Sequence, residues 1–297
     1  MTSLQFTAIG TEWVILLDHE LSQTQQTDLL EQLQTECARF DQLYSRFLPD
    51  SWLIGLSQTS GHSTHVLFAE AAEMFRFGQE LESLTTGHFT LNIADELTAL
   101  GYDATYSLQP SYDILKPKGK YWLDHNTLHL EGRVAFDLGA FGKGVLIDHL
   151  AAIILAEPYE HFLVDGSGDF FGTCKADGSA WTIGLQHPTD MDKFIGTFPL
   201  LQSGFASSGT LERHWPGGHH LLDGLSGQPT TNRHMAFVSA ATACLADGLS
   251  TALFVSPDTV WSQLQASWTY EACILEDSAD GVVFRRTSHF LGVLPGN

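Results

Sequence analysis

The sequence is poor in basic residues, with 14 Lys and Arg against 35 Asp and Glu in 297 residues and a formal net charge of −21. Nucleic acid and anionic membrane surfaces both need a cationic face, so this balance argues against either as a partner. An anionic ligand would have to be bound by a few local donors or through a metal ion.

Cysteine and long apolar runs are also scarce. The four cysteines are far apart and form no CxxC pair, which argues against a disulfide framework or a cysteine zinc site. No apolar run approaches the about 18 residues of a membrane span. Residues 1–18 alternate like a strand and lack the features of a signal peptide or lipid-attachment site. The sequence as it stands predicts a cytoplasmic protein, and an exported form without its leader would look the same.

The secondary-structure pattern predicts an α+β fold with largely antiparallel sheets and flanking helices. Helical spacing is clearest in residues 21–47 and 65–84, whereas short strand-like runs predominate in the middle of the chain. Residues 134–138 are expected to continue a sheet. The length suits one domain over residues 1–297, built as a single unit or as two intimate lobes.

Four stretches are candidates for chemistry, and the first is "VAFDLGAFGKGVLIDHL", residues 134–150. Asp137 closes the strand-like run, glycines follow at 139, 142 and 144, and Lys143 opens an apolar helix. Glycines at such a junction let a ligand approach the main chain, and the helix N-terminus presents N–H groups to an anion. An ordinary tight turn explains the same residues.

The second stretch, "VDGSGDFFG" at residues 164–172, is similar to a dinucleotide fingerprint. Its last glycine is one position late. A hairpin signal follows where a Rossmann unit needs a helix. We therefore interpret this stretch as a turn at the end of a strand.

The third stretch, residues 206–229, contains His214, His219 and His220, with Asp223 close by. Histidine titrates near neutral pH, so a functional loop is one interpretation, and solvated surface histidines are the other. A zinc site made of the three histidines is disfavoured, because adjacent side chains at 219 and 220 point in different directions along an extended chain.

The fourth stretch, "ATACLADGLSTALFV" at residues 241–255, is nearly all apolar or small. Asp247 and Thr251 interrupt it at spacing i, i+4, which places both oxygens on one helix face. A carboxylate on such a helix is costly without a partner. Oxygen ligands suit Mg²⁺ or Ca²⁺, although a helix with one solvated stripe has the same pattern.

Taken together, these stretches resemble the ApbE-type flavin transferases, the FAD:protein FMN transferases. The resemblance covers most of the chain, and its motifs occur in the family's order. They are "YSRFLPDSWLIGLSQ", "TTGHF", "FDLGAFGKGVLIDHLA", "FASSGTLERHW", "HLLDGLSG" and "ADGLSTAL". The resemblance implies an ApbE-like (T-fold-like) architecture.

The resemblance also implies an activity, namely transfer of FMN from FAD to a Thr or Ser hydroxyl of an acceptor protein, with release of AMP. Mg²⁺ would be held by Asp247, Thr251 and the main-chain carbonyl of Ala140. His220 would remove the hydroxyl proton, with Asp223 either orienting it or acting as the base itself. The residues expected around FAD are Phe47, Asp137, Gly139, Lys143 and Gly144.

The sequence departs from the family pattern at two positions. Gly224 stands where the family has proline, and Thr90 stands where it usually has aspartate. These changes leave two alternatives beside flavin transfer. One is hydrolysis of FAD to FMN and AMP, and the other is a non-catalytic FAD-binding protein.

Overall fold

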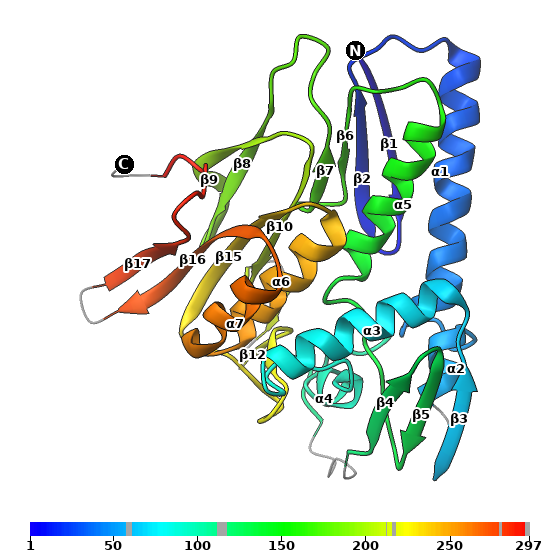
Figure 1. Cartoon of the computed structure of the whole chain (residues 1–297), viewed down its shortest axis with the longest axis vertical. Helices are drawn as coiled ribbons and strands as arrows, with labels where there is room; N and C mark the ends of the chain where they lie inside the picture. The colour runs from blue at the N-terminus through cyan, green and yellow to red at the C-terminus, as the bar shows by residue number, and fades with distance from the viewer. Residues whose placement is uncertain (58–60, 112–117, 212, 216–217, 279–280, 295–297) are drawn as a thin grey trace.

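The computed structural model describes residues 1–57, 61–111, 118–211, 213–215, 218–278 and 281–294. Its largest element is an eight-stranded antiparallel sheet in the order β1-β2-β6-β7-β10-β15-β16-β17 (Figure 1). The strands span Thr2–Ala8, Thr11–Leu17, Phe162–Asp165, Phe170–Gly172, Ser203–Gly209, Arg233–Ala240, Tyr270–Ser278 and Gly281–Arg286, respectively.

The central strands of this sheet pack against a core on each face, because successive side chains point to opposite sides. In β10, Ala206 belongs to the core shared with the helices, whereas the adjacent Phe205 belongs to a second core on the opposite side. Helices that contribute to the first core include α1 (Gln23–Tyr44), α5 (Gly142–Ala156) and α6 (Ala243–Val255), and the second core is covered by the hairpin of β8 (Trp181–His187) and β9 (Asp190–Leu200). The predicted α+β class with antiparallel sheets is confirmed.

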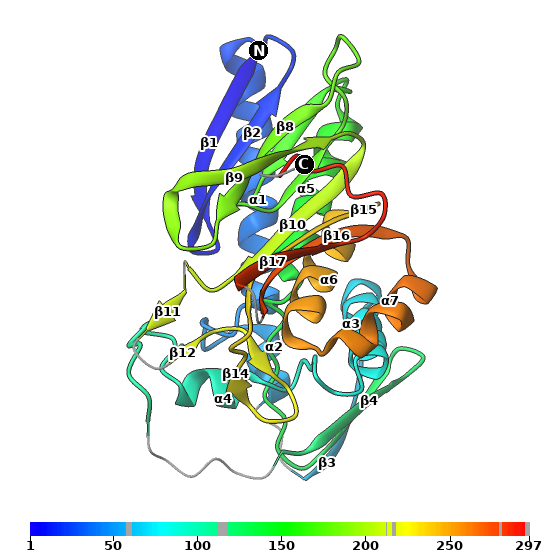
Figure 2. The same ribbon diagram turned by 90° about the vertical axis from the view of Figure 1, so that its left-hand side faces the viewer.

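A smaller three-stranded sheet lies beyond one end of the large sheet (Figures 1 and 2). Its order is β3 (His62–Val66), β5 (Thr127–Glu131) and β4 (Lys120–Asp124). The neighbouring helices are α2 (Trp52–Ser57), α3 (Ala69–Leu84) and α4 (Ala94–Ala99).

The remaining elements are short. They are β11 (His214–Trp215), β12 (Gly218–His219), β13 (Leu222–Asp223), β14 (Gln228–Pro229), η1 (Asp258–Val260) and α7 (Trp261–Ser267). In the part of the chain that the structure describes, no helix has the length and apolar character needed to cross a membrane.

The strand expected at residues 134–138 is wrong. The segment makes only an isolated bridge between Phe136 and Asn92. Side chains satisfy part of its backbone, since Ala135 N donates to Asn92 Oδ1 at 2.9 Å and Phe136 N donates to Ser57 Oγ at 3.2 Å. The segment is therefore an irregular connection that leads into the loop before α5.

Helices α5 and α6 are tied together at the start of α6. Asp148, on α5, accepts hydrogen bonds from Ala243 N and Cys244 N, each at 2.9 Å. The α6 N-cap, Thr242, accepts from Leu245 N at 3.1 Å through its side chain. A carboxylate and a capping hydroxyl thus satisfy the free N–H groups of the first turn of α6, which fixes how α6 lies against α5.

Candidate active site

A cavity of about 700 Å³ lies where the N-terminal end of α5 and the inner face of α6 meet the β1–β2 and β6–β7 turns. This volume is within the range of small-molecule sites. Among its described lining residues, three are cationic and five carry carboxylates, so side chains alone leave the cavity acidic. These residues are Arg46, Lys143 and Arg213, and Asp41, Asp137, Asp165, Asp169 and Asp247.

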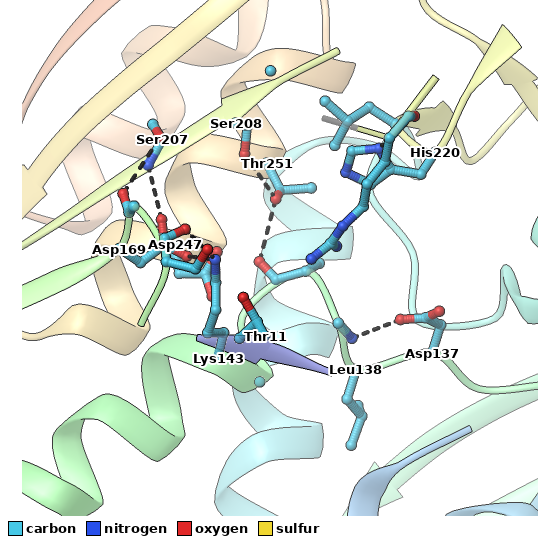
Figure 3. A pocket seen from close by; sticks show the side chains of 18 of the residues that line it. Thr11, Asp137, Leu138, Lys143, Asp169, Ser207, Ser208, His220, Asp247 and Thr251 are labelled. Carbon is cyan, nitrogen blue, oxygen red and sulfur yellow. Dashed lines mark hydrogen bonds and ion pairs between the residues drawn. The ribbon is translucent and has the colours of Figure 1, made fainter. Parts of the chain in front are cut away.

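Three residues whose oxygen atoms could bind a cation, Ala140, Asp247 and Thr251, line one wall of this cavity. Figure 3 shows Asp247 and Thr251. The Thr251 hydroxyl donates to the carbonyl oxygen of Ala140 at 3.2 Å, and Ser208 Oγ lies 3.2 Å from the same hydroxyl. Asp247, one helical turn before Thr251, accepts from Gly144 N at 2.9 Å. The structure thus brings Ala140, Asp247 and Thr251 to one place, although residues 140 and 251 are far apart in the sequence.

Asp247 is a buried carboxylate, with 5% of the residue exposed. Burial raises its pKa well above the usual value, and the nearby charge of Asp169 raises it further. The ammonium of Lys143 acts in the opposite direction. Because Asp247 faces the cavity and not the surrounding apolar core, a cation in the cavity would provide the charge compensation that it lacks.

Lys143 forms an ion pair that its neighbours in the sequence do not suggest. Its ammonium lies 2.9 Å from Asp169 Oδ2 and donates to Ser167 O at 3.3 Å. The other carboxylate oxygen of Asp169 accepts from Ser207 N, on β10, at 3.0 Å. The β6–β7 turn therefore holds the Lys143 ammonium, at the N-terminal end of α5, beside the oxygen atoms of Ala140, Asp247 and Thr251.

Asp137 is held by two partners at the cavity wall. Its Oδ1 accepts from Gly139 N at 2.6 Å, and Oδ2 forms an ion pair with Arg46. The Arg46 guanidinium lies 4.2 Å from the ring centre of Phe47 and 4.7 Å from that of Tyr102. Contact of a cation with two aromatic rings is favourable and limits its motion. The two aromatic rings and Asp137 thus form a fixed side of the cavity.

His220 lines the cavity and is partly exposed. Desolvation, together with the nearby charge of Arg213, lowers its pKa to about 3, so the ring is neutral at physiological pH. His220 Nδ1 lies 3.3 Å from the carbonyl oxygen of Arg213. Because a carbonyl oxygen only accepts, Nδ1 carries the hydrogen and Nε2 is left with the lone pair.

Asp223 lies on β13, in the hairpin of β13 and β14, and its side chain pairs with residues other than His220. Asp223 Oδ1 pairs with His88 Nδ1 at 2.9 Å, and Oδ2 accepts from Ser226 Oγ at 3.2 Å. Asp223 is absent from the described residues that line the cavity. The structure therefore does not show Asp223 orienting His220. Asp223 instead links the β13–β14 hairpin to His88, which follows the end of α3.

The two positions that depart from the family pattern, Gly224 and Thr90, lie next to the Asp223–His88 pair. Gly224 N donates to His88 O at 2.7 Å, a hydrogen bond that proline is unable to make. A Cβ atom at position 224 would meet Gly87 O at 2.5 Å. Thr90 donates to Glu82 Oε2 at 3.0 Å. Both substitutions thus have local structural partners.

Glycine is found at positions 139, 142 and 144 for different structural reasons. A Cβ at Gly144 would lie 2.4 Å from Ala243 O, so this glycine allows α5 and α6 to approach each other. Gly144 is not among the described lining residues, whereas Gly139 and Gly142 are. At Gly142 a Cβ would meet only Phe40, at 3.9 Å. The bare backbone at Gly144 is thus required by helix packing, and only the loop before it faces the cavity.

Other features of the predicted stretches are settled by their surroundings. The β6–β7 turn contains no helix, as expected for a strand-end turn. His219 Nε2 lies 2.7 Å from Thr230 O, away from His220. Within the ranges that the structure describes, no group of three or more His, Cys, Asp or Glu side chains is placed to hold a metal. A site built from one carboxylate, a hydroxyl and a carbonyl is of a different kind.

Several cavity residues had no clear signal in the sequence. Asp169 belongs to "VDGSGDFFG", which we interpreted only as a turn. Arg46 precedes the expected Phe47. The signals that were available are a carboxylate directly after a glycine turn and a cation beside an aromatic residue. Neither pattern identifies its distant partner.

The comparisons with known proteins agree with this architecture. A family model described as "ApbE family" matches residues 9–274. The FAD:protein FMN transferase of Escherichia coli (strain K12) is 22% identical over 275 residues, which cover 86% of this chain and 78% of that protein. The FAD:protein FMN transferase of Salmonella typhimurium is 23% identical over 277 residues, which cover 85% of this chain and 77% of that protein.

Solved structures share the fold. The flavin transferase ApbE from Vibrio cholerae superposes with a TM-score of 0.83 at 17% identity, covering 97% of each chain. The ApbE protein from Thermotoga maritima gives a TM-score of 0.79 at 22% identity, again covering 97% of each. The fold is thus that of the flavin transferases.

The family model spans most of the sequence, so the chain belongs to the ApbE family. The expected family and the expected enzyme class, a transferase, are confirmed.

Proposed function

We propose that this protein catalyses Mg²⁺-dependent protein flavinylation, in which FMN is transferred from FAD to a Thr or Ser hydroxyl of an acceptor protein and AMP is released. The observation that carries the proposal is the meeting of Ala140 O, Thr251 Oγ1 and Asp247 on one cavity wall, beside the ammonium of Lys143. The names of the related transferases support the same reaction.

The oxygen donors fit Mg²⁺. The ion prefers oxygen ligands at about 2.1 Å in an octahedron, so two neighbouring ligands lie about 3 Å apart. Ala140 O and Thr251 Oγ1 are 3.2 Å apart, and the buried Asp247 supplies the negative charge. When bound, Mg²⁺ would neutralise charge on the FAD pyrophosphate. This explains how a protein with a net charge of −21 binds a dianionic group.

The chain's own residues position FAD around that point. Lys143 offers its ammonium to a phosphate oxygen, and Gly139, which has no side chain, lets the nucleotide approach the main chain of the loop. Asp137 is fixed by Arg46, and Phe47 presents an aromatic ring to the cofactor. The cavity of about 700 Å³ receives the substrate in this scheme.

His220 receives the proton of the acceptor hydroxyl in this scheme. Its Nε2 lone pair is available because Nδ1 donates to Arg213 O. The lowered pKa ensures a neutral ring, although it also makes the ring a weak base. A bound pyrophosphate would oppose the effect of Arg213 and Lys143 on this pKa. Asp223 contributes by holding the hairpin in place through His88.

Mass spectrometry of the acceptor tests the proposal. Purified protein is incubated with FAD, Mg²⁺ and candidate acceptors that carry exposed Thr or Ser residues. The expected result is a mass increase on a hydroxyl equal to FMN less one water, and EDTA in the incubation should prevent it. Release of free FMN and AMP without acceptor labelling would instead show hydrolysis. No turnover of FAD with bound FAD would show a binding protein.

A further inference from the structure

The surroundings of Lys143 contain a charge arrangement that the proposed reaction does not use directly. Three carboxylates approach this ammonium, namely Asp169 at 2.9 Å, with Asp165 and the buried Asp247 within electrostatic reach. Figure 3 shows Lys143, Asp169 and Asp247 grouped together. One cation thus serves three carboxylates, and its position decides which of them is compensated.

Asp169 is the most firmly placed of the three. It is 2% exposed, and its Oδ1 accepts from Ser207 N on the central strand β10. Its Oδ2 is left to hold the ammonium. Lys143 also donates to Ser167 O, in the same turn, so both of its contacts come from the β6–β7 turn and neither comes from α6.

We infer that Asp169 is a positioning residue that holds Lys143 away from Asp247, and so keeps the Asp247 carboxylate available to a divalent ion. This rests on the proposed function, in which Asp247 is a ligand of Mg²⁺. The lysine stem is long and flexible, and a buried carboxylate attracts any cation within reach. Without the charge of Asp169, the ammonium would turn to Asp247 and compete with the metal.

The same arrangement places the ammonium beside the metal without replacing it. Asp247 receives the main-chain N–H of Gly144, the residue that follows Lys143. The lysine side chain is directed by Asp169, while the backbone directly after it is held by Asp247. By holding Lys143 apart from Asp247, Asp169 would let a bound phosphate contact the metal at one point and the Lys143 ammonium at another.

The metal affinities of four variants test this inference. The probe is Mn²⁺ alone, titrated into the intact protein without FAD by calorimetry. Asp169→Asn keeps the acceptor for Ser207 N but removes the charge, and it should weaken Mn²⁺ binding by about 10- to 100-fold, as loss of a residue behind a ligand does. Lys143→Met removes the competing ammonium and should tighten binding at least about threefold.

The two partners of one ion pair therefore shift metal affinity in opposite directions. In the Lys143→Met background, Asp169→Asn should cost much less than in the parent, because no ammonium is left to move. Asp169→Glu keeps the charge and should stay close to the parent. The exposed Lys193–Asp190 pair supplies matched controls, Lys193→Met and Asp190→Asn, which should leave Mn²⁺ affinity unchanged.

Two results would overturn the inference. Equal weakening by Asp169→Asn and Lys143→Met would show that the pair only stabilises the fold, and an unchanged affinity of Asp169→Asn would show that Asp169 has no part in it. Failure of the proposed metal site is distinguishable. In that case Mn²⁺ does not bind the parent, or binds Asp247→Ala equally well.

Discussion

Substitution of Gly144 by alanine tests how the two helices that form the site are packed. A Cβ at this position would lie 2.4 Å from Ala243 O and 2.7 Å from Cys244 Cα, both in the main chain of α6. Reaching ordinary contact requires the helices to separate by about 1 Å. Such overpacking costs about 1–3 kcal/mol or more, and the better helix propensity of alanine offsets part of it.

We expect a net loss of about 2 kcal/mol in the free energy of unfolding, which lowers Tm by about 3 °C in a protein of this size. Thermal unfolding followed by circular dichroism measures it. Gly142→Ala is the control in the same helix, since its Cβ would meet only Phe40 at 3.9 Å, and it should be neutral or slightly stabilising. If Gly144→Ala melts within one degree of the parent, the packing explanation is wrong.

Three further predictions concern the site. His220→Ala should lower the rate of flavin transfer about 100-fold or more, as loss of a general base does, with little change in FAD affinity measured by flavin fluorescence; an unchanged rate would remove His220 from the mechanism. Asp247→Asn should raise the metal-free Tm at pH 7, because burial raises the pKa of Asp247 and ionisation costs stability. This gain should shrink below about pH 4, where the folded and unfolded states both carry the proton, and a gain that grows on acidification would contradict it. Thr251→Ala should weaken Mn²⁺ binding less than Asp247→Ala in calorimetry, because a hydroxyl is neutral; the reverse order would exclude the carboxylate as the main ligand.

Local pattern was enough to predict some of the site. Asp247 and Thr251 share a helix face because of their spacing, and an apolar helix with one carboxylate is a recognisable signal. The α+β class followed in the same way from alternation and helical spacing. The resemblance to a family added Ala140, whose carbonyl leaves no trace in the identity of its side chain.

Contacts between residues far apart in the sequence could not be predicted from local pattern. Asp169 meets Lys143, and His88 meets Asp223 across 135 residues, because the topology places their turns together. The reason for Gly144 is likewise the backbone of α6, about a hundred residues later. Residues 134–138 have strand-like composition, but the side chains of Asn92 and Ser57 take the place of some of the partners that a strand ladder would supply. None of these contacts has a local periodicity.

A crystal grown with FAD and Mn²⁺ tests the central claim most directly, through the anomalous signal of the metal. The account predicts a peak about 2.2 Å from Thr251 Oγ1, bonded also to Asp247 and to the carbonyl of Ala140, and in contact with the FAD pyrophosphate. A peak bound elsewhere in the cavity, or FAD bound with its pyrophosphate away from Lys143 and these three residues, would contradict it.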